Sequence, residues 1–429
     1  MDLMEKIVSL CKRRGFVYPG SELYGGLNGT WDLGPLGSDL ARNIKYEWWQ
    51  SMVASREDVV GLNSSILHHT RVWEASGHIA SFTDSLIECK KCHTRFREDQ
   101  TPEKCNQCEG MEFTSPRQFN TMFKTHIGPV EESSSLLYLR PETAQGIFIN
   151  YQNVLNSTRV NIPFGIAQVG KGFRNEITTG NFLFRVREFE MMELEFFIEP
   201  GTDKKWHEYW KENRLKWFIN LGIRPENVKV VDLPKEDIAH YSKGTAELWY
   251  NWPFMGFGEL EGIANRGDYD LTQHSKLSGR DLTYTDKSGN KYLPIVIEPS
   301  VGVGRAMLAF LVDAYTEAGD RIILKLHPKI APFKVAVFPL LANKPDLVDK
   351  ARAVYQHLKL ELKIPTVWDD RGNIGKRYYA QDEIGTPWCV TVDFQTLSDA
   401  TVTVRERDNA VQNRLPVSEL DTYFTQKLK

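Results

Sequence analysis

Hydrophobic side chains recur with two different periods along this 429-residue chain, and each period predicts a different kind of element. From residue 34 to residue 52 they recur every fourth position, as on one face of an amphipathic helix: Leu36, Leu40, Ile44, Trp48 and Met52. Ser38 is available near the start as a helix cap. We therefore expect a long amphipathic helix in this segment.

Residues 160–198 show a period of two instead. Phe182, Phe184 and Val186 alternate with Arg185 and Arg187, which predicts strand structure with the two sets on opposite faces. Two antiparallel strands joined by a turn at residues 178–181 fit this pattern best.

The same period gives this predicted sheet a strongly charged face. Arg174 and Glu176 are two residues apart, and so are Glu193 and Glu195, so each pair should share a face. Charges on a buried face are costly unless they meet ligands or each other, whereas a solvent-exposed face of salt bridges would carry no such cost. The pattern leaves both interpretations open.

A change of pattern near residue 328 divides the chain. The prolines of residues 327–332 interrupt regular structure, and a strand-like, a helical and a strand-like segment follow at 334–340, 345–362 and 387–394. This alternation predicts a separate α/β domain. We expect a catalytic domain at 1–328 and a second domain at 329–429.

Composition favours a soluble, cytoplasmic protein. Hydrophobic residues make up 41% and charged residues 25% of the chain, and no apolar run approaches the roughly 20 residues that a membrane helix requires. The N-terminal segment has the mixed pattern of an amphipathic helix, with Leu3, Ile7 and Leu10 on one face, rather than a secretory signal. A net charge of −3 indicates that any nucleic-acid partner is recognised by placed groups rather than by bulk charge.

Four of the six cysteines form two CxxC pairs separated by twelve residues: Cys89, Cys92, Cys105 and Cys108. Two such knuckles supply the tetrahedral thiolate cage of a structural Zn²⁺ ion, and four cysteine ligands leave no open position for catalysis. Two disulfides or four surface thiols are the alternatives, and they fit a cytoplasmic chain poorly. We expect a zinc-ribbon-like insertion at about residues 86–115, and Cys11 and Cys389 as small buried residues.

Several segments together resemble the class II aminoacyl-tRNA synthetases. GKGFRNEITTGNFLFRVREFEMMELEFF at 170–197 is similar to their motif 2, and IEPSVGVGRAMLAFL at 297–311 to their motif 3. VWEASGH at 72–78, LRPETAQGIF at 139–148 and IGKRYYAQDEIGTP at 374–387 resemble glycyl-tRNA synthetases of the homodimeric type. The resemblance implies an α+β fold in which an antiparallel sheet with flanking helices carries the zinc-ribbon-like insertion and a C-terminal anticodon-binding domain.

This resemblance also implies a ligase that adenylates glycine with ATP and esterifies it onto tRNA(Gly), as a homodimer, with Mg²⁺ on the phosphates and structural Zn²⁺. Arg174 would hold the α-phosphate and Arg305 the γ-phosphate, since negative charge that develops on phosphoryl oxygens requires fixed cations. Glu176 would orient the adenine and Phe189 would stack on it. The implied ATP-binding residues are Arg174, Asn175, Glu176, Phe184, Arg185, Val186, Arg187, Glu188, Phe189, Glu259, Leu260, Gly302, Val303, Gly304 and Arg305.

Glycine has no side chain, so its selection requires anchoring of the ammonium group and exclusion of any Cβ. The resemblance implies that the following residues bind it: Arg97, Glu142, Phe189, Glu193, Glu298 and Ser300. Helix capping is an alternative role for Glu298 and Ser300, which precede the motif 3 helix, and a structural role is likewise an alternative for Glu142 after Pro141. The chain departs from the family pattern where Thr70 and Thr179 replace prolines, which bears on the motif 1 interface and on the motif 2 loop.

A chain with these motifs could have either of two other functions. A catalytically silent, nucleic-acid-binding relative should have lost phosphate-binding arginines or ammonium-binding carboxylates, and this chain retains both sets. A synthetase for proline, threonine or serine would not need three glutamates around a small pocket.

Overall fold

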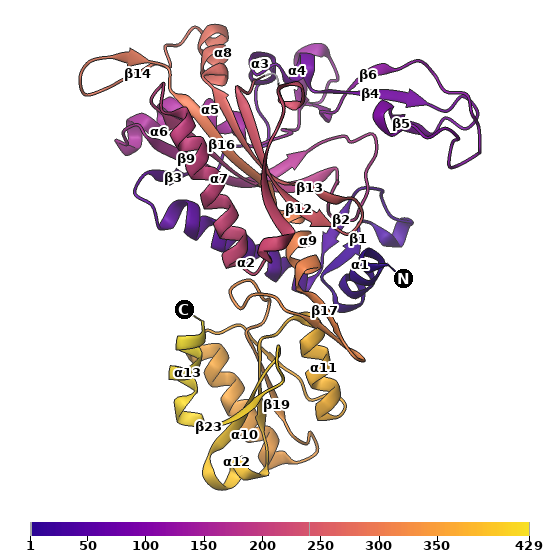
Figure 1. The fold of residues 1–429 in the computed structure, drawn as a ribbon, viewed down its shortest axis with the longest axis vertical. Coiled ribbons are helices and arrows are strands. Elements are labelled where there is room, and N and C mark those ends of the chain that lie inside the picture. The colour runs from indigo at the N-terminus through magenta and orange to yellow at the C-terminus, as the bar shows by residue number, and fades with distance from the viewer. Residues whose placement is uncertain (1, 240, 429) are drawn as a thin grey trace.

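The computed structural model describes residues 2–239 and 241–428 and shows two bodies, each built on its own sheet (Figure 1). The larger contains a seven-stranded sheet in the order β11-β12-β13-β16-β10-β9-β3. Its neighbours are antiparallel except for β3 and β9. The strands are β3 (Val59–Gly61), β9 (Phe164–Phe173), β10 (Glu188–Ile198), β11 (Val228–Asp232), β12 (Gly244–Trp252), β13 (Gly256–Gly267) and β16 (Ile295–Gly302).

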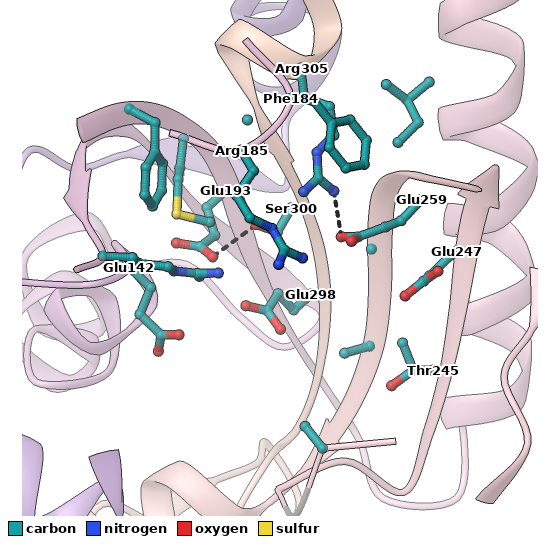
Figure 2. Close-up of a pocket in the computed structure, with 18 of the residues that line it drawn as sticks. Glu142, Phe184, Arg185, Glu193, Thr245, Glu247, Glu259, Glu298, Ser300 and Arg305 are labelled. Carbon is teal, nitrogen blue, oxygen red and sulfur yellow. Dashed lines mark hydrogen bonds and ion pairs between the residues drawn. The ribbon is translucent and has the colours of Figure 1, made fainter. Parts of the chain in front are cut away.

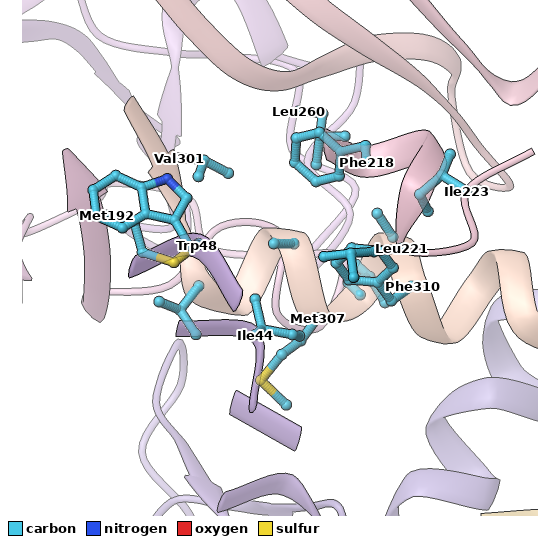
Figure 3. Close-up of a cluster of buried hydrophobic side chains, with 14 of the residues drawn as sticks. Ile44, Trp48, Met192, Phe218, Leu221, Ile223, Leu260, Val301, Met307 and Phe310 are labelled. Carbon is cyan, nitrogen blue, oxygen red and sulfur yellow. The ribbon is translucent and has the colours of Figure 1, made fainter. Parts of the chain in front are cut away.

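One face of this sheet packs on α2 (Pro35–Trp49), α7 (Asp203–Asn220) and α9 (Val303–Ala314). The core between them is largely apolar, with one fully buried ion pair between Arg214 of α7 and Glu261 of β13 at 2.7 Å. Figure 3 shows Trp48 of α2 against Met192 of β10, with Phe310 of α9 close to Phe218 of α7. The predicted helix at 34–52 is therefore confirmed, and a π-helical turn, Gln50–Ala54, extends it. Its predicted cap is wrong, because the helix begins at Gly34 and Pro35, and the Ser38 hydroxyl instead bonds the carbonyl of Leu33.

The opposite face of the sheet packs on α5 (Ala144–Phe148), α6 (Tyr151–Thr158) and α8 (Tyr269–Ser278). Around the sheet lie the smaller elements α1 (Leu3–Arg14), β1 (Val17–Pro19), β2 (Trp31–Leu33), α3 (Thr70–Ala75), α4 (His78–Ser81), β7 (Lys124–His126), β8 (Leu136–Tyr138), β14 (Tyr284–Thr285), β15 (Lys291–Tyr292), β17 (Tyr315–Ala318) and β18 (Arg321–Leu324). Short 3-10 turns occur at Glu22–Tyr24, Glu98–Gln100, Ser133–Ser135, Pro225–Asn227, Lys235–Asp237 and Val417–Glu419.

The period-two interpretation of residues 160–198 is correct only for β9 and β10, which pair antiparallel from Phe164↔Phe197 to Phe173↔Glu188. Residues 174–187 form an irregular loop, so Arg174 and Glu176 do not lie on a strand, and Phe184 and Arg185 do not point to opposite sides. The cause is a reversal at Asn181 and Phe182, both of which have positive φ. Phe182 is stabilised there by edge contact with Trp31, with ring centres 4.8 Å apart.

A small three-stranded sheet projects from the main body (Figure 1) and consists of β4 (Thr83–Glu88), β5 (Arg95–Arg97) and β6 (Arg117–Asn120). The four cysteines of the two CxxC motifs lie in the segments that connect these strands.

The C-terminal body has a five-stranded sheet in the order β20-β19-β21-β22-β23. The first three strands are parallel and the last two antiparallel, so this part has the α/β character expected from its sequence. Its elements are β19 (Val335–Pro339), α10 (Pro345–Gln356) with a π-helical end His357–Glu361, β20 (Thr366–Trp368), α11 (Ile374–Ile384), β21 (Trp388–Val392), α12 (Phe394–Asp399), β22 (Thr401–Glu406), β23 (Gln412–Pro416) and α13 (Leu420–Lys427).

The two bodies meet along the N-terminal helix and the connecting segment. Arg13 of α1 forms an ion pair with Glu383 of α11 at 3.1 Å, and Asn43 of α2 donates to the carbonyls of Ile330 and Ala331. Within the described part of the chain, no helix is long and apolar enough to cross a membrane.

Candidate active site

A cavity of about 370 Å³ opens on the side of the main sheet that carries α5 and α8 (Figure 2). β10, β13 and β16 form its floor, the loop 174–187 covers one side, and the start of α9 closes one end. Most of the residues expected from the sequence line this one cavity: Glu142, Arg174, Glu176, Phe184, Arg185, Val186, Phe189, Glu193, Glu259, Leu260, Glu298, Ser300, Gly302, Gly304 and Arg305.

Arg305 lines the end of the cavity near α9. Its guanidinium is bonded to Glu259 of β13 at 2.8 Å and lies 4.6 Å from the ring centre of Phe184 (Figure 2). Burial alone would raise the pKa of Glu259, but Arg305, followed by Arg174 and Arg185, holds it below its usual value. Fixed cations beside an aromatic ring suit a nucleotide, because they can meet both phosphate oxygens and a base.

Arg174 lies between this end and the carboxylate-rich end. Its guanidinium is 5.4 Å from the ring centres of both Phe82 and Phe189, and its Nε donates to the carbonyl of Pro141 at 3.1 Å. Two rings and one carbonyl fix the group, and among the described residues no further side-chain bond of Arg174 occurs, so its remaining N–H groups can fork onto an anion. Phe189, the predicted stacking partner of adenine, contacts Arg174, and the ring beside Arg305 is Phe184.

Three carboxylates gather at the other end of the cavity. Glu193 accepts bonds from the backbone N–H of Thr143 at 2.8 Å, from the Thr143 hydroxyl, and from the Ser300 hydroxyl at 2.9 Å. Glu298 receives both of its bonds from Nη1 of Arg266, at 3.0 and 3.1 Å. The α9 helix begins at Gly302 without a side-chain cap, so capping does not explain Glu298 or Ser300.

Behind these carboxylates lies a buried polar layer. Arg266 makes two parallel hydrogen bonds to Asp270. The side-chain amide of Gln145 donates hydrogen bonds to both Asp270 and Glu142, at 2.9 and 3.1 Å, and so links these two acids. On the far side of Glu142, Nε2 of His78 approaches it at 3.4 Å, and Ser76 holds Nδ1 of that ring at 2.8 Å. Burial would raise the pKa of Glu142, but His78 and then Arg266 reverse this and hold it well below its usual range. The carboxylate is therefore ionised and fixed in orientation.

Five of the expected residues do not line the cavity. Arg97 lies in the insertion and pairs with Asp99 at 3.1 Å. Glu188 pairs with Lys171 at the surface, and Arg187 donates to the carbonyls of Asn28 and Glu176, where it supports the loop. The remaining two are Asn175, whose backbone bonds Thr121, and Val303, which is buried in the α9 core.

Sequence reasoning missed the buried layer and part of the wall. The missed residues that line the cavity include Met191, Tyr241, Thr245, Glu247, Gly262 and Ala264. The one available signal was the i, i+4 spacing of Arg266 and Asp270, which predicts an ion pair on one side of a turn. Nothing in the sequence indicated that β13 would place that pair beside Glu298.

The two positions that depart from the family pattern make specific bonds. Thr70 begins α3 and donates to the carbonyl of Leu136 at 2.8 Å. Thr179 donates to the side-chain oxygen of Asn28 at 3.0 Å, a bond that anchors the loop and that proline could not make.

The cysteine cluster has the dimensions of a tetrahedral thiolate site. Sγ of Cys89 lies 3.7 Å from that of Cys108, and Sγ of Cys92 lies 3.5 Å from that of Cys105. Four thiolates at about 2.3 Å from a zinc ion would be about 3.8 Å apart, far more than a disulfide bond of about 2.05 Å. The four residues therefore fit structural Zn²⁺, and Cys11 and Cys389 are buried as expected.

Comparison with known proteins agrees with this geometry. The family described as "tRNA synthetase class II core domain (G, H, P, S and T)" matches residues 123–314, and "Anticodon binding domain" matches residues 334–427. A solved prolyl-tRNA synthetase from Giardia lamblia, in complex with prolyl-adenylate, has the same fold with a TM-score of 0.73 at 16% identity, covering 99% of this chain and 78% of its own. The fold and the cavity thus define a class II aminoacyl-tRNA synthetase.

Curated relatives show to which family within this class the chain belongs. "Glycine--tRNA ligase" from Thermobifida fusca (strain YX) is 51% identical over all of this chain and 98% of its own length. The protein of the same name from Borreliella afzelii (strain PKo) is 53% identical over 98% of this chain and 96% of its own. The chain belongs to the glycine–tRNA ligase family.

Proposed function

We propose that this protein activates glycine with ATP to form glycyl-adenylate and transfers the glycyl group to the 3′ end of tRNA(Gly). The observation that carries the proposal is the separation of positive and negative side chains along this cavity. Cationic Arg174 and Arg305 occupy one part, and Glu142, Glu193 and Glu298 line the other. A zwitterion without a side chain on Cα matches this arrangement, with its carboxylate toward Arg174 and its ammonium toward the glutamates.

Each group then has a definable task. Arg174, held by two rings, meets the α-phosphate and the attacking carboxylate, where negative charge develops. Arg305 meets the γ-phosphate, and the ring of Phe184 beside it offers a surface for the adenine. Glu193, fixed by three bonds, and Glu298, fixed by Arg266, anchor the ammonium.

Mg²⁺ bound together with ATP would supply positive charge against the phosphate groups. Glu247 and Glu259 both line the nucleotide end, and their oxygens are the ligand type that Mg²⁺ prefers. Burial and then the charge of Glu259 raise the pKa of Glu247, so an added cation would be favoured there. We further propose that the protein works in the cytoplasm as a homodimer with one structural zinc per chain.

Pyrophosphate exchange with each of the twenty amino acids is the decisive experiment, together with charging of tRNA(Gly). Glycine alone should support exchange. Exchange with proline, threonine or serine instead would refute the substrate, and no exchange with any amino acid would indicate a silent relative.

A further inference from the structure

One buried acid next to the glycine end has no assigned role. Glu195 follows Glu193 by two residues on β10 and faces the same side of the sheet, but its side chain is fully buried behind the cavity wall. Within the part of the chain that the structure describes, neither of its carboxyl oxygens has a hydrogen-bond partner. An ionised carboxylate without a partner in such a place would carry a large desolvation penalty, because its charge has left water and meets no compensating group.

The strand register makes the isolation of Glu195 more severe. β10 and β16 pair Glu193 with Ser300 and Phe196 with Ile297, so Glu195 lies directly across from Glu298. One carboxyl oxygen from each of Glu193, Glu195 and Glu298 lies within 4.8 Å of the other two. Like charges opposed across two strands destabilise a sheet, and acids this close do not all ionise in a water-free site.

The bonding pattern identifies which acid is neutral. Glu193 is satisfied by three donors and Glu298 by Arg266, whereas Glu195 has none. Burial, and then the charge of Glu298, raise the pKa of Glu195 well above its usual value. Burial also raises the pKa of Glu298 well above its usual value, but there the direct ion pair with Arg266 opposes the rise and stabilises the ionised form, a contact that Glu195 lacks.

Among the described residues, the charged groups that act most strongly on Glu195 are Glu193 on its own strand, Glu298 on β16, Arg266 on β13 and Asp270 on α8. Only one of these four groups, Arg266, is a cation. Arg266 is already bonded to both Glu298 and Asp270. On β9 the residue paired with Glu195 is the apolar Ile166. The empty pocket therefore carries an excess of negative charge.

We infer that Glu195 is protonated in the empty enzyme and releases its proton to solvent when the ammonium group of glycine enters between Glu193 and Glu298. The proton substitutes for the missing cation and keeps a pocket built for an ammonium group stable while it is vacant. When the ammonium arrives, its charge stabilises the ionised form of Glu195, which adds attraction from behind the contact residues. Glu195 is thus a positioning residue that couples glycine binding to proton release. This inference rests on the proposed function.

The test is proton release measured by calorimetry. The probe is 5′-O-(glycylsulfamoyl)adenosine, titrated across the neutral pH range in pairs of buffers with different ionisation enthalpies. We expect the parent protein to release up to one proton per site more than the Glu195→Gln variant, which keeps the shape but cannot ionise. The analogue with a hydroxyl in place of the ammonium should bind both proteins with the same proton balance. Glu199→Gln, which removes an exposed acid just beyond the same strand, should behave as the parent does.

The outcomes separate the two proposals. Failure of the glycyl analogue to bind the parent protein refutes the proposed function. Binding with the same proton release in the parent and Glu195→Gln refutes the role of Glu195. A second measurement does not need a ligand. Because the folded pKa is raised, Glu195 stabilises the fold below its unfolded pKa and loses this contribution as pH rises, so the parent should lose stability relative to Glu195→Gln with increasing pH. A pH-independent difference between them would also overturn the inference.

Discussion

Arg305 on the first turn of α9 is bonded to Glu259 of β13 across the mouth of the cavity, with 2.8 Å between Nη1 and Oε1. The bond joins two elements that form opposite sides of the nucleotide end. It holds the guanidinium against Phe184 before any substrate is present. A cation that is fixed in advance needs no reorganisation when charge develops on a phosphate, and this property makes it effective in catalysis.

Replacement of Arg305 by alanine should therefore nearly abolish adenylate formation without unfolding the protein. Loss of one preorganised contact to developing charge costs about 3 kcal/mol, or about 10² in rate. The side chain is partly exposed, so thermal unfolding followed by circular dichroism should change little. Arg305→Lys, which keeps the charge but not the planar fork, should fall between the two. Undiminished pyrophosphate exchange in Arg305→Ala would remove the nucleotide role of this residue.

The sequence predicted the elements more reliably than the connections between them. β9 and β10 follow from local alternation, but the loop at 174–187 does not, because the positive φ of Phe182 depends on a contact with Trp31, distant in the chain. Arg266 escaped notice for a similar reason. Its only local signal is the i, i+4 spacing from Asp270, and only the pairing of β13 with β16 brings it to Glu298. Motif resemblance grouped most of the cavity residues, since it carries long-range information that periodicity lacks.

The cysteine cluster should contain one zinc ion per chain, detectable by elemental analysis of the purified protein. Cys105→Ser should lose the metal, because the cage has no substitute ligand and metal binding is coupled to local folding. Cys389→Ala, which alters a buried thiol in the C-terminal body, should retain it. A metal-free protein with the four thiols joined in disulfides would contradict the assignment.

Lys334, at the junction of the two bodies, should make the free energy of unfolding depend on pH in the alkaline range. Its ammonium donates to the carbonyls of Lys329 and Ala331 at 2.8 Å, yet burial lowers its pKa from 10.5 to about 8. Between these two values the unfolded chain binds more protons, so the stability of the parent relative to Lys334→Met should rise with pH, by at most about 3 kcal/mol.

Urea unfolding at several pH values from about 7 to about 10 measures this difference directly. Lys325→Met, an exposed neighbour, serves as the control and should show no such trend. A constant difference between the parent and Lys334→Met across the range would show that the buried amine does not titrate there.

Ser300 and Glu193 should divide the task of selecting glycine between exclusion and attraction. Ser300→Gly opens space beside the expected Cα position, so alanine should support measurable exchange with a smaller loss for glycine. In a merely apolar pocket, one methyl group changes the binding free energy by only about 1–3 kcal/mol. In a rigid site, steric overlap with the added methyl group can impose a larger penalty. Ser300→Ala separates volume from bonding, because it removes the hydroxyl bond to Glu193 and keeps the methylene.

Glu193→Gln should have the opposite effect, and the bonds around it explain why the variant still folds. Thr143 donates twice to Oε2 and Ser300 once to Oε1, so a glutamine can turn its carbonyl toward Thr143 and donate its amide to the Ser300 hydroxyl. The volume is unchanged but the negative charge is lost, so the glycine KM should rise while alanine remains excluded. Exchange kinetics with both amino acids decide the matter. A permissive Glu193→Gln together with a Ser300→Gly that still rejects alanine would reverse the two roles.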